Sequence, residues 1–426
     1  MTPLQNSTEP NILFLGGMFP EEAEEWIRHN SKGNVHNAAN VMQWNLLRGL
    51  RHHLGSALHV VSSPFVGSFP KFFRKLLLPS FQFTIDRQPV GHSAGFLNLP
   101  LVKHVSRYLS VQPRLRSAVE SATPPIAVVA YSFTSVMAHA LKRAKRYDPS
   151  VITCLVVADL PEYMNLQAHK PRLSSMLAKY TLNRLYKTLE YVDCVVVLTE
   201  PMVAKMGFTK PHVVIEGISE APRANDTSPT AHDSTAAEQV VLYTGGLNEA
   251  FGVLNLVKAF ITLPDPSLRL VLCGAGDAVD EIKDYAARDD RIVYKGLVSR
   301  EEVIALQHQA TVLVNPRQNT GEYVKYSFPS KLMEYMASGT PVVAYPLAGV
   351  PQDYREYFYL VPDHEIDSLA STIQRVLATP GEERSRIGQR ARDFVLQEKS
   401  PEVQTAKILQ MISDITAQRE ASYDRV

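Results

Sequence analysis

Three cations and two carboxylates, one of them inside a predicted helix, gather in a single stretch of this chain, residues 311–346. The segment TVLVNPRQNTGEYVKYSFPSKLMEYMASGTPVVAYP contains Arg317, Lys325, Lys331 and Glu334. Guanidinium and ammonium groups suit a diphosphate, because they donate charge-assisted hydrogen bonds to its oxygens. A carboxylate accepts hydrogen bonds from sugar hydroxyls. The segment therefore predicts a site for a nucleotide sugar, with the cations on the diphosphate and Glu334 on hydroxyl groups.

The same stretch predicts the elements that position these side chains. Thr311–Val314 is short, apolar and β-branched, as a buried parallel strand should be. A helix is expected after Pro329, and Gly339 ends it before a second buried strand at Pro341–Tyr345. In such a unit the helix N-terminus points its free N–H groups into the loop that follows the strand. Backbone amides near Ser330 are therefore expected to assist the cations.

Part of this segment resembles a known signature. SFPSKLMEYMASGTPVVA is similar to the donor site of retaining GT-B glycosyltransferases of family 4. That family has two glutamates eight residues apart, and the resemblance implies that the second, Glu334, holds the ribose hydroxyls. The first, which contacts the donor sugar, falls on Tyr326, and Glu322 is the candidate that replaces it. KYSFPSKLMEYMASGTPVV also resembles the version found in many bacterial polysaccharide enzymes.

A plainer interpretation of the same residues stays open. The segment could be an ordinary turn between a strand and a helix, with Glu334 paired to Lys331 three residues earlier. On that reading the charges would have no ligand.

Three glycine turns at strand ends complete the predicted donor site. Gly245 and Gly246 follow the strand Val240–Tyr243, where a missing Cβ lets the backbone approach a phosphate. In the family this turn supplies an arginine and a lysine to the diphosphate. The corresponding positions in this chain are occupied by Gly246 and Phe251. The resemblance implies that the other two turns line the base pocket. Their residues are Gly274, Lys295 and Leu297.

The acceptor is expected in the front half of the chain. Gly17 ends the first predicted strand, and the resemblance places its loop near donor phosphate and acceptor. Asn37 and Asn40 begin the next helix with amides that suit sugar hydroxyls. Asp159 and Glu162 follow the strand ITCLVVA, and an acid there could orient an acceptor hydroxyl or take its proton. A capped helix and a loop-fixing aspartate explain these residues equally well.

Charge is unevenly distributed along the 426 residues. Residues 1–218 contain 23 Lys and Arg against 14 Asp and Glu, although the net charge of the chain is only +1. This excess suggests an anionic partner, either a phosphorylated acceptor or an anionic membrane surface, and plain solvated surface explains it equally well. Gly67–Leu78 mixes aromatic, aliphatic and basic residues, which fits either a domain face with solvated charges or a peripheral membrane contact. The basic residues form no stripe with aromatics that would indicate nucleic acid binding.

Other composition features narrow the class of protein. The three cysteines lie in apolar strand-like runs, which predicts buried thiols and neither a disulfide nor a metal site. No apolar run reaches the ~18 residues of a membrane span, and the N-terminus lacks the pattern of a secretory leader. The expected location is the cytoplasm, with the inner face of the cell membrane as the second possibility. No cofactor is expected, and a DxD-type metal motif is absent.

Strands alternate with helices on both sides of Ser219–Glu238, a stretch rich in Ser, Thr, Ala, Pro and Asp. We predict an acceptor domain over residues 1–218, a linker or insertion over 219–238 and a donor domain over 239–400. A C-terminal helix over 401–426 is expected to pack back on the first domain. The fold class is α/β, with two facing Rossmann-like domains and a cleft between them, the GT-B architecture.

The sequence predicts a retaining glycosyltransferase that uses a nucleotide-diphosphate sugar and a glycan or lipid-linked acceptor. The predicted catalytic residues are Asp159, Glu322 and Lys331. Two alternatives remain: a nucleotide-sugar epimerase of the same architecture, and a non-catalytic protein that only binds the nucleotide sugar.

Overall fold

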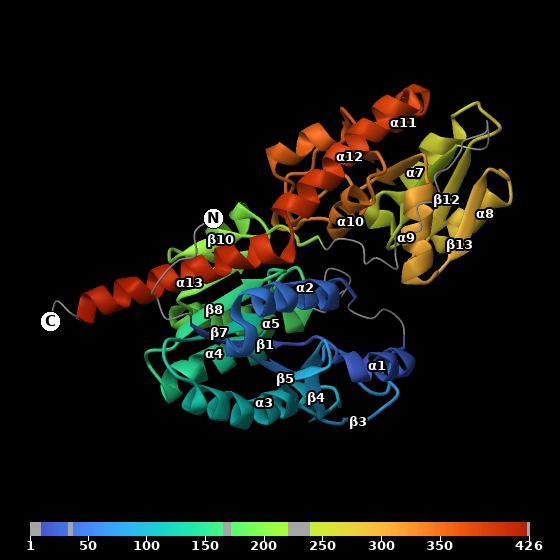
Figure 1. The fold of residues 1–426 in the computed structure, drawn as a ribbon. Helices are drawn as coiled ribbons and strands as arrows, with labels where there is room; N and C mark the ends of the chain where they lie inside the picture. The colour runs from blue at the N-terminus through green and yellow to red at the C-terminus, as the bar shows by residue number, and fades with distance from the viewer. Residues whose placement is uncertain (1–9, 33–36, 165–171, 220–238, 424–426) are drawn as a thin grey trace. The chain divides into compact units, whose positions relative to one another are not determined.

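The computed structural model describes residues 10–32, 37–164, 172–219 and 239–423. They divide into two compact units (Figure 1). Unit 1 comprises the described parts of residues 1–218 and 401–426, and unit 2 comprises those of 219–400. The predicted linker lies outside the described residues except for Ser219.

Unit 1 is built on one eight-stranded sheet of order β10-β9-β8-β7-β1-β2-β5-β4. Neighbouring strands are parallel except for the antiparallel pair β4–β5. A separate two-stranded ribbon joins β3 and β6. Because most of the strands are parallel, their carboxyl ends lie along one edge. The strands are β1 (Asn11–Gly16), β2 (Leu58–Ser62), β3 (Leu77–Leu78), β4 (Phe81–Ile85), β5 (Gln88–Ser93), β6 (Phe96–Leu97), β7 (Ile126–Tyr131), β8 (Ile152–Val157), β9 (Cys194–Val197) and β10 (His212–Val214).

The helices of unit 1 bury apolar stripes against this sheet. Every residue of β7 and β8 is buried, which requires cover on both faces of the sheet. The helices are α1 (Glu24–Asn30), α2 (Asn37–Leu54), α3 (Val102–Ser121), α4 (Ser135–Tyr147), α5 (Arg172–Tyr186), α6 (Glu200–Met206) and α13 (Pro401–Tyr423).

The final helix, α13, is part of unit 1. It packs on α2 at Gly49, where a Cβ atom would lie 2.2 Å from the carbonyl oxygen of Pro401. Asp193 fixes its far end, because its carboxylate lies 2.7 Å from Arg419 and 2.6 Å from Lys145. Apolar residues of α13 enter the core that also holds Trp44 and residues of β1.

Unit 2 is built on a six-stranded parallel sheet of order β13-β12-β11-β14-β15-β16. Its strands are β11 (Val240–Thr244), β12 (Arg269–Cys273), β13 (Ile292–Gly296), β14 (Val312–Asn315), β15 (Val342–Ala344) and β16 (Tyr359–Leu360). Its helices are α7 (Val253–Ile261), α8 (Val279–Ala286), α9 (Arg300–Gln309), α10 (Ser330–Ser338), α11 (Ile366–Ala378) and α12 (Gly381–Glu398).

The predicted α/β class with a parallel sheet in each of two domains is confirmed. Several elements of unit 1 were not predicted, among them α3 and the β4–β5 hairpin. Of the described helices, none is both long enough and apolar enough to span a membrane.

Gly274 allows the strand ends of unit 2 to approach closely. A Cβ atom there would lie 1.8 Å from the carbonyl oxygen of Gly245, and the residue has φ +142°. We expect Gly274→Ala to lower the free energy of unfolding of unit 2 by about 1–3 kcal/mol, since backbone must move. Denaturant unfolding measures this. The control is Gly381→Ala, whose nearest neighbour is the flexible Arg384 side chain at 3.9 Å. Equal stability of the two variants would contradict the close approach.

Candidate functional site

A hydrogen-bonded tyrosine ties α10 to the end of β11. The Tyr335 hydroxyl accepts from the backbone N–H of Thr244 at 2.8 Å and donates to its carbonyl at 3.1 Å. The ring is fully buried. Burial, with a smaller effect from Tyr243, raises the pKa of Tyr335. The α10 helix is thereby fixed relative to the Gly245–Gly246 turn, which follows Thr244 directly.

A second connection places Glu334 beside the same turn. The buried Gln307 of α9 donates through Nε2 to Oε1 of Glu334 at 2.6 Å. The same nitrogen donates to the Thr244 hydroxyl at 3.1 Å. Since the side-chain amide of Gln307 orients the carboxylate from behind, Oε2 is left with Lys331 as its recorded partner.

Lys331 and Glu334 form the ion pair that the plainer interpretation of the sequence expects. The Lys331 Nζ atom lies 2.8 Å from Oε2 and 3.0 Å from Oε1. The two side chains remain 33% and 39% exposed. A pair this exposed is worth only about 0–1 kcal/mol. Its presence therefore does not prevent either side chain from turning to a charged ligand.

Arg317 lies next to position 251, where the family resemblance implies a lysine and this chain has Phe251. Its guanidinium carbon is 5.8 Å from the centroid of the Phe251 ring and 5.2 Å from that of Tyr323. Its Nη2 donates to the Ser327 hydroxyl at 3.0 Å, and its buried Nε has no hydrogen-bond partner among the described residues. The loop after β14 therefore places a cation next to position 251.

Tyr243, at the end of β11, connects Arg317 electrostatically with the glycine turn. Burial raises the pKa of Tyr243 to about 12, and the charge of Arg317 acts in the opposite direction. The Tyr243 hydroxyl donates to the carbonyl of Gly246 at 2.9 Å. Gly246 packs on Phe251, whose ring would lie 3.0 Å from an added Cβ. The turn, the ring and the guanidinium thus form one local cluster.

Glu322 is bonded to the residue that replaces the first glutamate of the signature. Tyr326 is buried, and its hydroxyl donates to Oε1 of Glu322 at 3.0 Å. The Nζ atom of Lys325 lies 3.3 Å from the same oxygen. The hydrogen bonds with Tyr326 and then with Glu322 raise the pKa of Lys325. A carboxylate therefore lies at the tip of the Tyr326 side chain, although position 326 has none of its own.

The remaining predicted donor residues lie at the neighbouring strand ends. The Gly274 N–H donates a hydrogen bond to the Gly296 carbonyl at 2.7 Å. Lys295 is paired with Glu302 at 3.5 Å, and Leu297 is 81% exposed. Burial raises the pKa of the Cys273 thiol, and the charges of Lys295 and Lys331 oppose that rise. These charges therefore converge near the end of β12.

Ser330 begins α10 at the carboxyl edge of the sheet. Pro329 precedes it, and no side chain in the described part of the chain caps this end of the helix. The helix is therefore able to direct backbone amides toward an anion at this edge.

On the acceptor side, Asp159 is exposed at the end of β8, next to the end of β7. Burial and the Asp159 carboxylate both raise the pKa of Tyr131, the last residue of β7. The next residue, Ser132, has φ +81°, a conformation that residues with a Cβ atom rarely adopt. Such backbone strain often accompanies functional sites. Ser132 was not among the predicted site residues, because serine as a residue type carries no sign of this conformation.

The amides predicted for sugar binding have structural partners. Asn40 is buried and accepts from the Phe19 N–H at 2.8 Å. Asn37 is exposed and accepts from Arg28 at 2.7 Å. Gly17 is held by Gln43, and the Phe65 ring occupies the space beside it, 2.0 Å from an added Cβ. The α2 amides therefore shape the loop after β1.

Glu162 is likewise engaged. Its Oε2 accepts from the Tyr186 hydroxyl at 2.7 Å, which joins the loop after β8 to α5.

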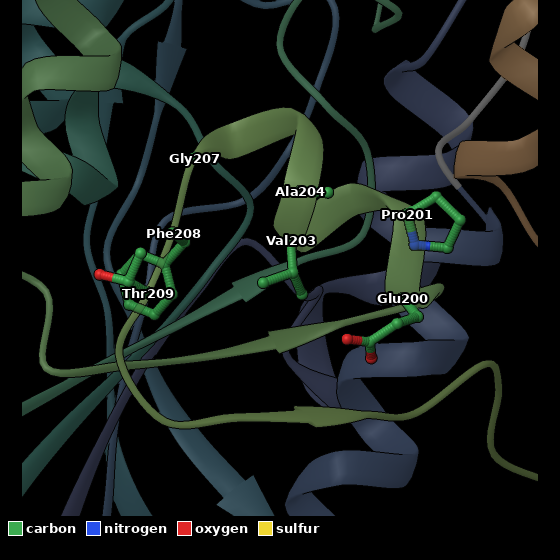
Figure 2. A pocket seen from close by; sticks show the side chains of 7 residues that line it. All are labelled: Glu200, Pro201, Val203, Ala204, Gly207, Phe208 and Thr209. Atoms are coloured by element: carbon green, nitrogen blue, oxygen red, sulfur yellow. The ribbon is translucent and has the colours of Figure 1, made fainter.

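Two surface hollows in the described structure are not lined by any of the predicted site residues. One of about 560 Å³ lies on α6 and the turn that follows it (Figure 2). It is lined by Glu200, Pro201, Val203, Ala204, Gly207, Phe208 and Thr209. A second of about 630 Å³ lies at Ile261 and 285–291. Neither contains a set of groups suited to catalysis. Over the described ranges, no three His, Cys, Asp or Glu side chains are grouped to hold a metal ion.

Part of unit 2 is similar to a known protein family. Residues 225–394 match the family described as Glycosyl transferases group 1. No curated protein sequence matches the chain. The match covers most of unit 2, including β11, α10 and the residues between them.

Solved structures similar to this chain share its fold over nearly its whole length. A sucrose-phosphate synthase from Thermosynechococcus elongatus has a TM-score of 0.65 at 18% identity, and the alignment covers 96% of this chain and 100% of that one. A trehalose-6-phosphate structure from E. coli, bound with UDP-2-fluoro glucose, has a TM-score of 0.61 at 11% identity, with 95% and 99% covered. A UDP-forming trehalose-phosphate synthase from Burkholderia xenovorans, in complex with glucose-6-phosphate, has 0.62 at 12%, with 94% and 99% covered.

These identities establish the fold alone, and the family match lies within unit 2. Together they support a glycosyltransferase of the GT-B fold whose unit 2 carries a glycosyl transferases group 1 domain.

Proposed function

We propose that this protein is a retaining glycosyltransferase of family 4 type that acts on a glycan or lipid-linked saccharide. Its donor is a nucleoside diphosphate sugar bound by unit 2. The observation that supports this most is the placement of Arg317 against Phe251, beside the Gly245–Gly246 turn. If the glycine turn were only structural, there would be no need for the loop after β14 to place Arg317 next to position 251.

In the proposed reaction the acceptor hydroxyl oxygen forms a bond to the anomeric carbon of the sugar. The bond from that carbon to the diphosphate oxygen breaks, and the nucleoside diphosphate leaves with the electron pair. Arg317, Lys325, Lys331 and the amides at Ser330 would stabilise the negative charge that develops on it. The proton lost by the acceptor would pass to Asp159 or to a diphosphate oxygen.

Glu334 would hold the ribose, because Gln307 orients one of its oxygens and the ion pair on the other is weak. Glu322 would contact the donor sugar in place of the acid absent at Tyr326, to which it is bonded. The turns at Gly274, Lys295 and Leu297 would border the base.

Two substitutions separate the parts of the donor site. Arg317→Ala should weaken binding of a nucleoside diphosphate about tenfold or more, because charge-assisted hydrogen bonds are lost. It should leave binding of the parent nucleoside unchanged. Glu334→Gln should weaken both ligands, since the ribose is common to them. Titration calorimetry or NMR measures the affinities for UDP and uridine. The same measurement is then repeated with GDP and guanosine and with ADP and adenosine.

Lys258→Ala is the matched control for the cation. Lys258 is an exposed lysine on α7, and its loss should leave both affinities unchanged. If Arg317→Ala also left diphosphate binding unchanged, the assignment of the diphosphate to this corner would be wrong.

The reaction itself is tested by product analysis. UDP-glucose is the first donor to try, because similar structures are described as UDP-forming or bound with a UDP sugar. We expect release of UDP that depends on a saccharide acceptor, with the sugar appearing in α linkage as in the donor. Conversion of the UDP-sugar without acceptor would indicate an epimerase. Binding without turnover, across a panel of acceptors, would indicate a non-catalytic protein.

Asp159 can be tested once an acceptor is identified. Asp159→Asn keeps the shape of the side chain but removes its ability to take a proton. We expect turnover to fall about 10²-fold with donor affinity unchanged. Asp86→Asn is the control, because that aspartate is also exposed and lies in the turn between β4 and β5. Full activity of Asp159→Asn would remove Asp159 from the mechanism.

A further inference from the structure

Large exposed apolar side chains of this protein gather in one region of unit 1. Leu101 is 90% exposed, Leu77 and Leu109 are each 62% exposed, and Phe72 is 49% exposed. Leu76, Val102 and Val105 are also exposed. We call these seven residues the α3 face. Contiguous apolar surface of this kind is unusual on a soluble domain and marks an interaction site.

Backbone hydrogen bonds hold the segments of the α3 face together. The Asn98 N–H donates to the carbonyl of Leu76 at 2.7 Å, and β3 pairs with β6 through Leu77 and Leu97. The Phe69 N–H donates to the carbonyl of Asn98 at 2.9 Å. Figure 1 shows β3 and α3 at the same edge of unit 1.

Within α3, the exposed apolar residues form a stripe. Val102, Val105 and Leu109 recur at helical spacing, whereas Arg107, Val111 and Leu115 point into unit 1. Leu101, just before the helix, has φ +68°, which is unfavourable for a residue with a Cβ atom. Its neighbours fix it there, because Val102 and Lys103 donate to the carbonyls of Pro100 and Leu99. The backbone thus holds an exposed leucine outward.

Positive charge surrounds the α3 face. Residues 67–121 contain eight Lys and Arg but only two Asp and Glu. Lys71, Arg74 and Lys75 are exposed next to Phe72 and Leu76. The acidic residues of α1 lie in its first turn. The other end of α1 lies against the basic segment, because the backbone of Asn30 and Lys32 is hydrogen-bonded to that of residues 72–74.

The interior side of α3 adds to this charge. Arg107 is buried, with the Ser63 hydroxyl and carbonyl as its hydrogen-bond partners at 3.0 and 2.6 Å. Burial and, to a smaller extent, the charge of Arg107 lower the pKa of Lys103 to about 8. Burial and then the same two cations lower the pKa of His104. No carboxylate contributes to either of these two pKa shifts.

We propose that the α3 face binds the surface of an anionic lipid bilayer. Its leucines, valines and Phe72 enter the region between headgroups and acyl chains, and Lys71, Arg74 and Lys75 contact anionic headgroups. Charge complementarity favours lipid over a second copy of the chain, since two such faces would repel each other. This inference goes beyond the proposed transfer reaction, and its test needs neither donor nor turnover.

The test is flotation of the full-length protein with vesicles. We expect binding to vesicles of phosphatidylglycerol and phosphatidylcholine, little binding to phosphatidylcholine alone, and a decrease with added salt. Lys71→Glu/Arg74→Glu/Lys75→Glu should lower the partition coefficient at least about tenfold. Leu77→Ser/Leu101→Ser/Leu109→Ser should lower it by a similar factor. These side chains are exposed, and circular dichroism verifies that the variants fold.

Matched controls lie in unit 2. Lys258→Glu/Arg300→Glu/Arg375→Glu makes the same change of charge at exposed positions, and Ile261→Ser/Val293→Ser removes exposed apolar groups. Both should bind like the wild type. The proposal is overturned if anionic vesicles fail to bind the wild type at low salt, or if the α3-face variants bind as well as the controls. Self-association that only the leucine variant abolishes would assign the face to a second copy.

Discussion

The hydrogen bonds of the Tyr335 hydroxyl with Thr244 determine the geometry of unit 2 at its predicted donor site. The hydroxyl satisfies both backbone groups of Thr244, the residue at which β11 ends and the glycine turn begins. A buried backbone group without a partner is costly, so α10 cannot shift without breaking these bonds. Gln307 bonds to the Thr244 hydroxyl and to Glu334, which fixes a carboxylate of α10 relative to β11. The helix, the turn and the acid are therefore one rigid assembly.

The charges around this assembly differ from those of the signature in an instructive way. Three positions of the family pattern lack their expected side chains, 246, 251 and 326, and for 251 and 326 an adjacent segment places a suitable group nearby. Glu322 reaches Tyr326 by one turn of the chain, and Arg317 reaches Phe251 from the next strand of the sheet. The aromatic rings at both positions favour this, since rings pack well against a guanidinium and a phenol hydroxyl binds a carboxylate. A site can thus keep its charge while the residues that supply it change.

Much of the secondary structure could be predicted because its signals are local. Buried β-branched runs bounded by Gly and Pro predicted strands at 311–314 and 341–345, whose ends lie within one residue of those observed. The α3 helix was missed because Pro113 lies in its middle, where a proline normally indicates the end of a helix. The β4–β5 hairpin turns at Asp86 and Arg87, which both have positive φ, and arginine gives no such signal. Contacts such as Gln307 with Glu334 join residues far apart in sequence, so no local pattern indicates them. The predicted sugar ligands Asn37 and Asn40 accept hydrogen bonds from the Arg28 side chain and from the Phe19 N–H, partners that no local pattern indicates.

The packing of α13 has a consequence for biosynthesis. Ile408, Met411, Ile412 and Ile415 belong to the same core as Trp44 and Phe14, although almost the whole chain separates them in sequence. During translation the ribosome must complete unit 2 before it makes the residues that close this core. Nascent unit 1 therefore exposes the surface of α2 that these side chains later cover. A stop codon near position 400 would leave unit 2 whole but unit 1 with an open core, which makes the last helix a late requirement for the first half of the protein.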